Sequence, residues 1–197
     1  MDNLTPDINH NLKDNLYKYY LGQVVPNLKT KYKNIHEVPK VTKIIINQSA
    51  GKNSNSKDLN TLVEELAKIT GQYGKLTKAK KSIAGFGITK SDFLGIKVTL
   101  RRQRMYYFLN RLIHLSLPRI RDFQGLKITS FDGHGNYSFG IEEQLMFPEI
   151  NPESFGSSKG LQISIVTTAK TDEEAYWLLK ALGMPFKQNT KFSFSPL

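Results

Sequence analysis

Hydrophobic positions recur along the chain at two different spacings, and these spacings predict its helices and strands. Between residues 59 and 69, five aliphatic residues recur every three or four positions, as on one side of an amphipathic helix. Gly71 follows at the point where a glycine often ends a helix. The same spacing predicts an N-terminal helix over residues 8–21, with Pro26 and Pro39 interrupting the segment after it.

Two more helices are predicted in the second half of the chain. An apolar stripe runs over residues 105–113 and should end before Pro118. Thr171 and Glu174 have the spacing of a capping box, which opens a last helix that Gly183 ends.

Strands are predicted where β-branched or aliphatic residues cluster or alternate with polar ones. These segments are 41–47, 76–80, 96–100, 137–141 and 161–165. After a glycine-containing loop over 81–95, Ile96, Val98 and Leu100 alternate with Lys97, Thr99 and Arg101. Because neighbouring side chains of a strand point to opposite faces, one face is aliphatic and the other polar.

The order of these elements is helix, strand, helix, two strands, helix, two strands, helix. It predicts an α+β fold with a mostly antiparallel sheet and helices on one face. The other face should stay open and basic, carrying Lys43, Lys97, Thr99 and Arg101. We expect a single domain over residues 1–197, with tails at 1–10 and 188–197 that are either flexible or docked on a neighbour.

The charge of the chain points to a polyanionic partner. The net charge is +11 over 197 residues, and residues 75–104 hold nine Lys and Arg against the single Asp92. A solvated basic face is the alternative, but the run lies in predicted strands and a glycine-rich loop, which favours binding. Residues 142–153 are acidic and suit either a protein partner or ordinary solubility.

Composition excludes several classes of function. The chain has no Cys and four widely spaced His, so we expect no disulfide, no metal site and no cofactor. Its first residues are acidic and it has no apolar run near 18 residues, so we expect no targeting peptide and no membrane association. Its basic residues are densest on strands and a loop rather than on an amphipathic helix, which also argues against a peripheral membrane protein.

Residues 75–90 hold the clearest candidate chemistry. Lys78, Lys80, Lys81 and Lys90 offer charges to phosphates, and Gly85 and Gly87 allow the backbone to approach a ligand closely. Phe86, between these glycines, is expected either to stack on a base or to plug the loop from inside. Arg101, Arg102 and Arg104 suit phosphate binding, the alternative being pairing with nearby carboxylates.

No catalytic set emerges from the sequence. Asp132 and His134 sit in a glycine-rich turn, where tight-turn chemistry explains them better than acid–base catalysis does. Glu142 and Glu143 are adjacent in a predicted strand and so would point to opposite faces. We therefore expect a protein that is not an enzyme. Trp177 is predicted to lie in the core.

Six segments in order resemble the L-five family of bacterial-type large-subunit ribosomal proteins. They are 76–86, 97–101, 118–126, 131–138, 147–150 and 167–175. The resemblance implies a structural protein of the large subunit that binds 5S ribosomal RNA in the central protuberance. It also implies contacts with large-subunit ribosomal RNA, P-site transfer RNA, a small-subunit head protein across an intersubunit bridge, and neighbouring large-subunit proteins.

The resemblance also suggests which residues make these contacts. For ribosomal RNA they are Lys43, Asn47, Gln72, Lys75, Thr77, Lys78, Lys80, Lys81, Lys97, Thr99 and Arg101. For transfer RNA they are Ser82, Ala84, Gly85, Phe86, Gly87 and Lys90 in a loop. For the bridge they are Phe131, Asp132, His134, Asn136, Tyr137 and Glu142.

The chain departs from the family pattern at several positions. The loop is less basic at 87 and 89, Arg102 stands where glycine is usual, and His134 stands where Arg is usual. Extended ends and a composition rich in Lys, Asn and Ile favour an organellar ribosome, plastid before mitochondrion, over the bacterial cytoplasm. The competing function is a free RNA-binding protein or RNA chaperone outside the ribosome.

Overall fold

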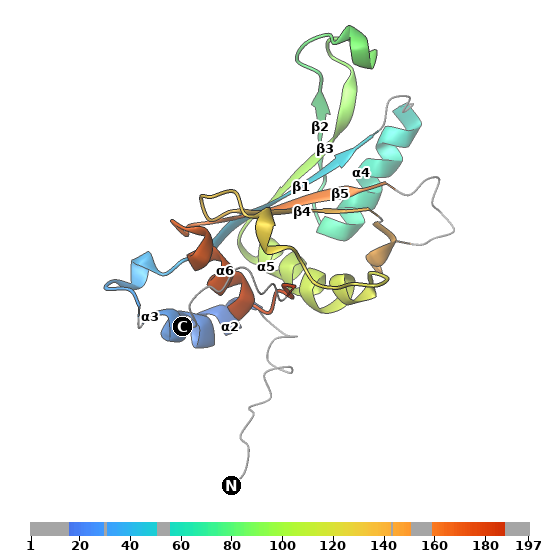
Figure 1. Cartoon of the computed structure of the whole chain (residues 1–197). Coiled ribbons are helices and arrows are strands. Elements are labelled where there is room, and N and C mark those ends of the chain that lie inside the picture. Colours follow the sequence, from blue (N-terminus) through green and yellow to red (C-terminus); the bar gives the residue numbers. More distant parts are fainter. Residues whose placement is uncertain (1–15, 30, 51–55, 143, 151–158, 188–197) are drawn as a thin grey trace.

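The centre of the protein is a five-stranded antiparallel sheet (Figure 1). The structure is a computed structural model and describes residues 16–187 except 30, 51–55, 143 and 151–158. Its strands, in chain order, are β1 (Val41–Ser49), β2 (Lys75–Lys78), β3 (Phe93–Leu100), β4 (Tyr137–Ile141) and β5 (Leu161–Thr167). In space their order is β2-β3-β1-β5-β4, so β2 and β4 are the two edges.

One face of the sheet is covered by helices and the other is open. Ile44 and Ile46 on β1, and Ile163 and Ile165 on β5, are at most 1% exposed and pack into one core cluster with residues of the helices. Figure 1 shows α5 (Arg102–Arg111) and α6 (Asp172–Ala181) on the same side of the sheet. This confirms the predicted α+β fold and the division of the faces.

The N-terminal helix continues well beyond its predicted end at residue 21. It begins in the described residues as α2 (Leu16–Tyr19), widens into a π turn (Tyr20–Val24) and continues as α3 (Val25–Lys29). The expected break at Pro26 was wrong. The π turn displaces the hydrogen-bonding pattern by one residue just before Pro26, and the helix continues through this proline.

The next helices follow their predictions more closely. Helix α4 (Ser56–Thr70) ends at Gly71, whose φ of +69° explains the glycine. Helix α5 continues through a π turn and a 3₁₀ turn that includes Pro118, one turn further than predicted. Between α4 and α5, the guanidinium of Arg111 donates to the carbonyl oxygen of Ile69 at 2.7 Å.

The capping box of α6 forms with a small change. The Thr171 hydroxyl oxygen accepts the Glu174 N–H at 3.4 Å, while the Glu174 carboxylate accepts the N–H of Lys170 rather than that of Thr171, at 2.8 Å. Trp177 is only partly buried and lies outside the core cluster, so its predicted core position was wrong. Its ring lies in a hollow between α3 and α6, with the Lys180 ammonium 5.0 Å from its centre.

The part of the chain that the structure describes contains no group of three metal-ligating side chains. Within the same residues, no helix is both long and apolar enough to cross a bilayer. The predicted tails at 1–10 and 188–197 lie outside the described residues.

Candidate nucleic-acid interface

The open face carries a row of polar side chains that crosses the sheet. Antiparallel register places Lys75 of β2 beside Lys97 of β3, Lys97 beside Asn47 of β1, and Asn47 beside Gln162 of β5. We call these four residues the polar row. Lys75, Lys97 and Gln162 are exposed and Asn47 is partly so. The row presents two cations and two amides on one surface.

The two lysines of the polar row are directly opposite each other on adjacent strands. Like charges in this position repel and destabilise a sheet. Neither Lys75 nor Lys97 forms an ion pair within the described residues. A bound polyanion would screen this repulsion. The two lysines would therefore cost the sheet less stability with an anion bound than in the free protein.

A second line of polar residues lies next to the polar row. Thr99 of β3 and Ser164 of β5 flank Ile45 of β1, and the hydroxyl of Ser138 on β4 donates to that of Ser164 at 2.9 Å. Lys43 is half-buried further along β1. The hydroxyls of Thr99, Ser164 and Ser138 are neutral, and they can donate hydrogen bonds to the sugar hydroxyls of an RNA helix and accept hydrogen bonds from them.

The arginines after β3 extend the basic surface. Arg101 caps α5 from an extended backbone, and Arg101, Arg102 and Arg104 are all exposed. No described carboxylate lies within ion-pair distance of any of these three arginines. Within the described residues, the ion pair that forms joins Arg111 and Glu149. The alternative that the arginines are neutralised within the fold is therefore not supported by the described residues.

Gln72 lies where α4 leads into β2. Its side chain is partly exposed, and its backbone is held by the Thr70 hydroxyl, which donates to the Gln72 carbonyl at 2.8 Å. The turn therefore fixes Gln72 near the β2 edge without using its carboxamide.

Strands β2 and β3 continue into a hairpin that projects from the rest of the molecule (Figure 1). Backbone bonds tie Ala79 to Asp92 at 2.8 Å and Ile83 to Ile88 at 2.9 Å, so the loop over 79–92 is an ordered extension. Gly87 has a φ of +59°, which lets the tip turn back. Strand β3 accordingly begins at Phe93, earlier than predicted.

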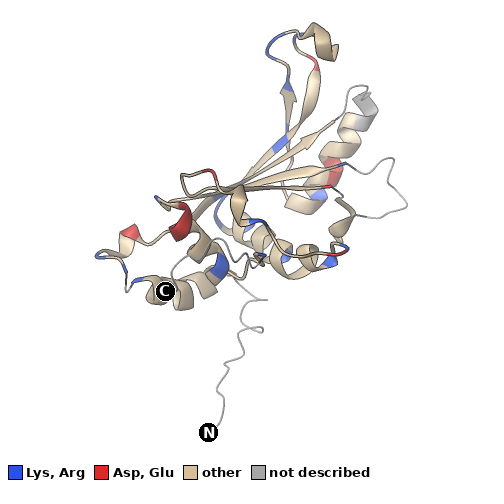
Figure 2. Cartoon of the chain, viewed as in Figure 1, with Lys and Arg blue, Asp and Glu red and all other residues tan. Residues whose placement is uncertain are grey.

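The hairpin carries cations and exposed apolar groups together. Lys80, Lys81 and Lys90 are exposed, and the Lys78 ammonium lies 4.9 Å from the centre of the Phe93 ring. Figure 2 shows basic segments along this hairpin. The Thr77 hydroxyl donates to the Gly95 carbonyl at 3.0 Å, so this side chain braces the strands.

The loop residues assigned to transfer RNA lie together at the hairpin end. Ser82, Ala84, Gly85, Phe86, Gly87 and Lys90 are all exposed. Phe86 is 66% exposed, which rules out the buried plug. The Ser82 hydroxyl accepts the Lys90 N–H at 2.9 Å and holds the base of the tip together.

The turn over residues 131–137 lies beside the opposite edge, at β4. The Asp132 carboxylate accepts the backbone N–H groups of His134 and Asn136 and the side-chain amide of Asn136. Partial burial alone would raise the pKa of Asp132, but these hydrogen bonds outweigh it and the pKa is lowered. The carboxylate therefore holds the turn, as expected from its position, and the nearby His134 also helps to lower its pKa.

Two residues assigned to the bridge point inward. Tyr137 is 0% exposed and its hydroxyl donates to the Lys127 carbonyl at 2.9 Å. The Phe131 ring packs on it at 4.7 Å. A direct contact between the Tyr137 side chain and another protein is thus incompatible with this fold, whereas Asp132, His134 and Glu142 are exposed.

The structure therefore separates the candidate residues into three groups. The polar row and its neighbours lie on the open face, the loop residues lie on the hairpin at the β2 edge, and the 131–142 segment lies at the β4 edge. Sequence reasoning missed Gln162, Ser164 and Ser138 on the open face. The alternation of Gln162 and Ser164 with Leu161, Ile163 and Ile165, and of Ser138 with Tyr137 and Phe139, was the signal that would have placed them there.

Comparisons with known proteins show the family to which the chain belongs. The family "Ribosomal protein L5" matches residues 34–88, and the C-terminal part of the same ribosomal family matches residues 93–186. The large ribosomal subunit protein uL5 of Trichodesmium erythraeum is 54% identical over 181 residues, which cover 90% of this chain and all of that protein. The uL5c proteins of Rhodomonas salina and Spinacia oleracea are each 55% identical, over 90% and 87% of this chain and over 100% and 67% of their own lengths.

The cyanobacterial and plastid relatives match this chain at nearly equal sequence identity. The identities therefore favour neither a bacterial nor a plastid ribosome. The matches extend over both halves of the described fold and favour a ribosomal protein over a free RNA-binding one. The chain belongs to the uL5 family of large ribosomal subunit proteins, which are structural components of the ribosome and not enzymes.

Proposed function

We propose that the chain binds 5S ribosomal RNA through its open face, in the central protuberance of the large subunit. The observation that carries this proposal is the polar row, in which Lys75 and Lys97 repel each other until an anion is bound. A-form RNA exposes sugar hydroxyls and phosphates across a wide, shallow minor groove. A nearly continuous polar sheet face with cations at one side is complementary to that surface.

The test is binding of the purified protein to 5S ribosomal RNA and to an unrelated RNA hairpin across a salt series. We expect Thr99→Ala with Arg101→Ala to lower 5S affinity by at least about tenfold, because a hydrogen bond to a charged group contributes about 1.5–3 kcal/mol. Lys170→Ala, which removes an exposed cation at the start of α6, is the matched control. Equal binding of both RNAs, unchanged in the double variant, would contradict the site.

Lys75→Ala and Lys97→Ala separate phosphate contacts from shape recognition. Each lysine that neutralises a phosphate contributes roughly one unit to the slope of log affinity against log salt. We expect each variant to reduce that slope without changing the preference for 5S RNA. A slope that is unchanged in both would exclude the polar row from phosphate binding.

We also propose that the hairpin reaches P-site transfer RNA. The exposed Phe86 at its tip and the exposed Lys90 support this assignment. In large subunits rebuilt with Phe86→Ala, transfer RNA affinity should fall while 5S RNA incorporation stays normal. Phe93→Val, nearer the sheet, is the control variant because it leaves the tip intact.

The exposed part of the 131–142 segment is proposed to face a small-subunit head protein. His134 and Glu142 are available for that contact, with Tyr137 supporting the turn from inside. Charge reversal at Glu142 should weaken subunit association in a light-scattering assay but leave binding of 5S RNA unchanged.

A plastid ribosome is the proposed location. The content of Lys, Asn and Ile supports an AT-rich organellar gene. Fractionation of the source cells tests it, since the chain should be recovered with plastid ribosomes; recovery with mitochondrial or cytoplasmic ribosomes would refute it.

A further inference from the structure

Tyr73 lies between α4 and β2, at the edge of the sheet that carries Lys75. Its side chain is 75% exposed, more than any other large apolar side chain in the described part of the protein. A single exposed aromatic residue is common on protein surfaces and is not by itself a binding site. Tyr73 differs from such a residue in its position on the sheet and in the rigidity of its backbone.

The direction of the Tyr73 side chain follows from its neighbour Gly74. A Cβ on Gly74 would lie 2.3 Å from a methyl carbon of Ile96 and 3.0 Å from one of Val98, and both of these side chains are buried on the covered face. Residue 74 therefore faces the covered side of the sheet. Since side chains alternate along a chain that enters a strand, Tyr73 and Lys75 face the open side.

Strand register places Tyr73 at the end of the second line of polar residues on the open face. Lys75 pairs with Lys97 of β3 in antiparallel register, so two positions back from Lys75 correspond to two positions forward from Lys97. This brings Tyr73 level with Thr99, which in turn pairs with Ile45 of β1. The aromatic ring therefore borders the proposed RNA-binding surface at the β2 edge.

The backbone on both sides of Tyr73 is held in place. The Thr70 hydroxyl oxygen lies 2.7 Å from the carbonyl oxygen of Leu66 and 2.8 Å from that of Gln72, which ties the turn to the end of α4. On the other side, Gly74 packs on β3 without room for a side chain. A ring on a fixed backbone has only its own side-chain torsions to restrict when a ligand binds, so the entropic cost is low.

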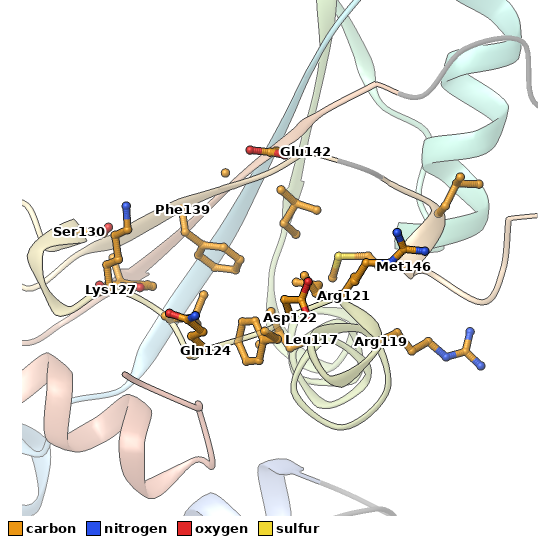
Figure 3. A pocket seen from close by; sticks show the side chains of 18 residues that line it. Leu117, Arg119, Arg121, Asp122, Gln124, Lys127, Ser130, Phe139, Glu142 and Met146 are labelled. Atoms are coloured by element: carbon orange, nitrogen blue, oxygen red, sulfur yellow. Dashed lines mark hydrogen bonds between the residues drawn. The ribbon is translucent and has the colours of Figure 1, made fainter. Parts of the chain in front are cut away.

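The opposite edge of the sheet offers no such ring within the described residues. Figure 3 shows the Phe139 ring of β4 pointing into a groove that Leu117 and Gln124 line from the other side. Phe139 is 9% exposed, and Tyr137, also on β4, is 0% exposed. An RNA on the open face therefore meets an exposed aromatic ring at the β2 edge and not at the β4 edge.

We propose that Tyr73 stacks on an unpaired base of the RNA that binds the open face. The stacking rests on the proposed function, in which Lys75 and Lys97 hold phosphates beside the ring. Every nucleobase has a π face, so stacking on tyrosine requires no particular base. It does require a base that is not already stacked within a helix, and this is the feature of the RNA that Tyr73 selects.

The affinity of Tyr73→Ala for 5S ribosomal RNA tests the stacking. We expect a loss of at least about fivefold, which is the lower end of what alanine costs at a base-stacking position. Tyr73→Phe keeps the ring and should bind like the native chain, whereas Tyr73→Leu keeps apolar area without a π face and should bind like the alanine variant. Tyr107→Ala is the matched control: it removes a 51% exposed ring from α5, on the covered side, and should change nothing.

Salt dependence separates stacking from a charge effect. Stacking releases no counterions, so Tyr73→Ala should lower the affinity at every salt concentration without changing the slope of log affinity against log salt, whereas Lys75→Ala should change that slope. A fully paired RNA duplex is the second control, because its interior offers no unpaired base. Tyr73→Ala should bind the duplex as the native chain does.

An unchanged 5S affinity in Tyr73→Ala, with the native chain still preferring 5S RNA, would overturn the stacking but not the proposed function. An equal loss on 5S RNA and on the duplex would also overturn it, and so would native affinity in Tyr73→Leu. If the native chain shows no preference for 5S RNA over the unrelated hairpin, the proposed function fails instead. Tyr73→Ala is then compared on the hairpin, whose loop supplies unpaired bases, and an unchanged affinity there overturns the stacking.

Discussion

The carboxylate of Asp172, in the first turn of α6, accepts the backbone N–H of Gly135 at 2.9 Å, although the two residues are 37 positions apart. It also accepts the N–H of Gly133 at 3.1 Å. A Cβ on Gly135 would lie 2.7 Å from the Ala169 carbonyl oxygen, so the turn approaches the start of α6 closely. Asp172 thus holds the 131–137 turn against the helix and places His134 at the surface.

Replacing Asp172 by Ala should release this turn. Two N–H groups lose their acceptor, and we expect the free energy of unfolding to fall by about 1–3 kcal/mol. Urea unfolding measures the loss, and hydrogen exchange at Gly133 and Gly135 locates it. Asp172→Asn keeps one acceptor oxygen and should lose less; an equal loss in both variants would mean that charge near the helix start, rather than these bonds, is responsible.

Gly95 should not tolerate a side chain. A Cβ there would lie 2.3 Å from the Gln48 carbonyl oxygen of the neighbouring strand. We expect Gly95→Ala to lower stability by at least about 1–3 kcal/mol, because β1 and β3 must move apart. Gly140→Ala, on β4 with open space around its Cβ, is the control and should be nearly neutral in the same unfolding measurement. Similar losses at both positions would argue against the close approach.

Arg102 adopts a φ of +55°, a region that favours glycine. This backbone conformation gives a physical reason to expect glycine at this position. We expect Arg102→Gly to raise the free energy of unfolding by about 0.5–1 kcal/mol. Arg104→Gly, two residues further into α5, should lower it by a similar amount, because glycine is unfavourable inside a helix. A loss of stability in both variants would show that the Arg102 side chain contributes more than its backbone strain costs.

Asp132 should make the turn sensitive to acid. Its pKa is lowered in the folded protein, so its stabilising effect is complete above the unfolded pKa and is lost as pH falls through the folded pKa. The stability difference between the native chain and Asp132→Ala should therefore shrink from pH 7 to pH 3. Urea unfolding at the two pH values measures it, and the comparison cancels the other carboxylates. A constant difference would show that the variant acts through packing.

Much of the open face could be predicted because side chains alternate along a strand. The spacing in 96–100 was enough to place Lys97 and Thr99 opposite the aliphatic residues. The capping box at Thr171 and the glycine after α4 were equally local signals, since a cap depends on residues only a few positions apart. The net charge of +11 indicated a polyanion, but no charge pattern names a particular RNA.

Only the tertiary structure decided how these local elements combine. The polar row depends on strand register, which brings Lys75, Lys97, Asn47 and Gln162 together from four strands. The burial of Tyr137 and the bond from Gly135 to Asp172 depend on which segments pack across the fold. Alternation along one strand is a property of its backbone, whereas neighbours across a sheet are selected by the packing of the whole chain, and this is why the sequence determined the faces and the structure determined the site.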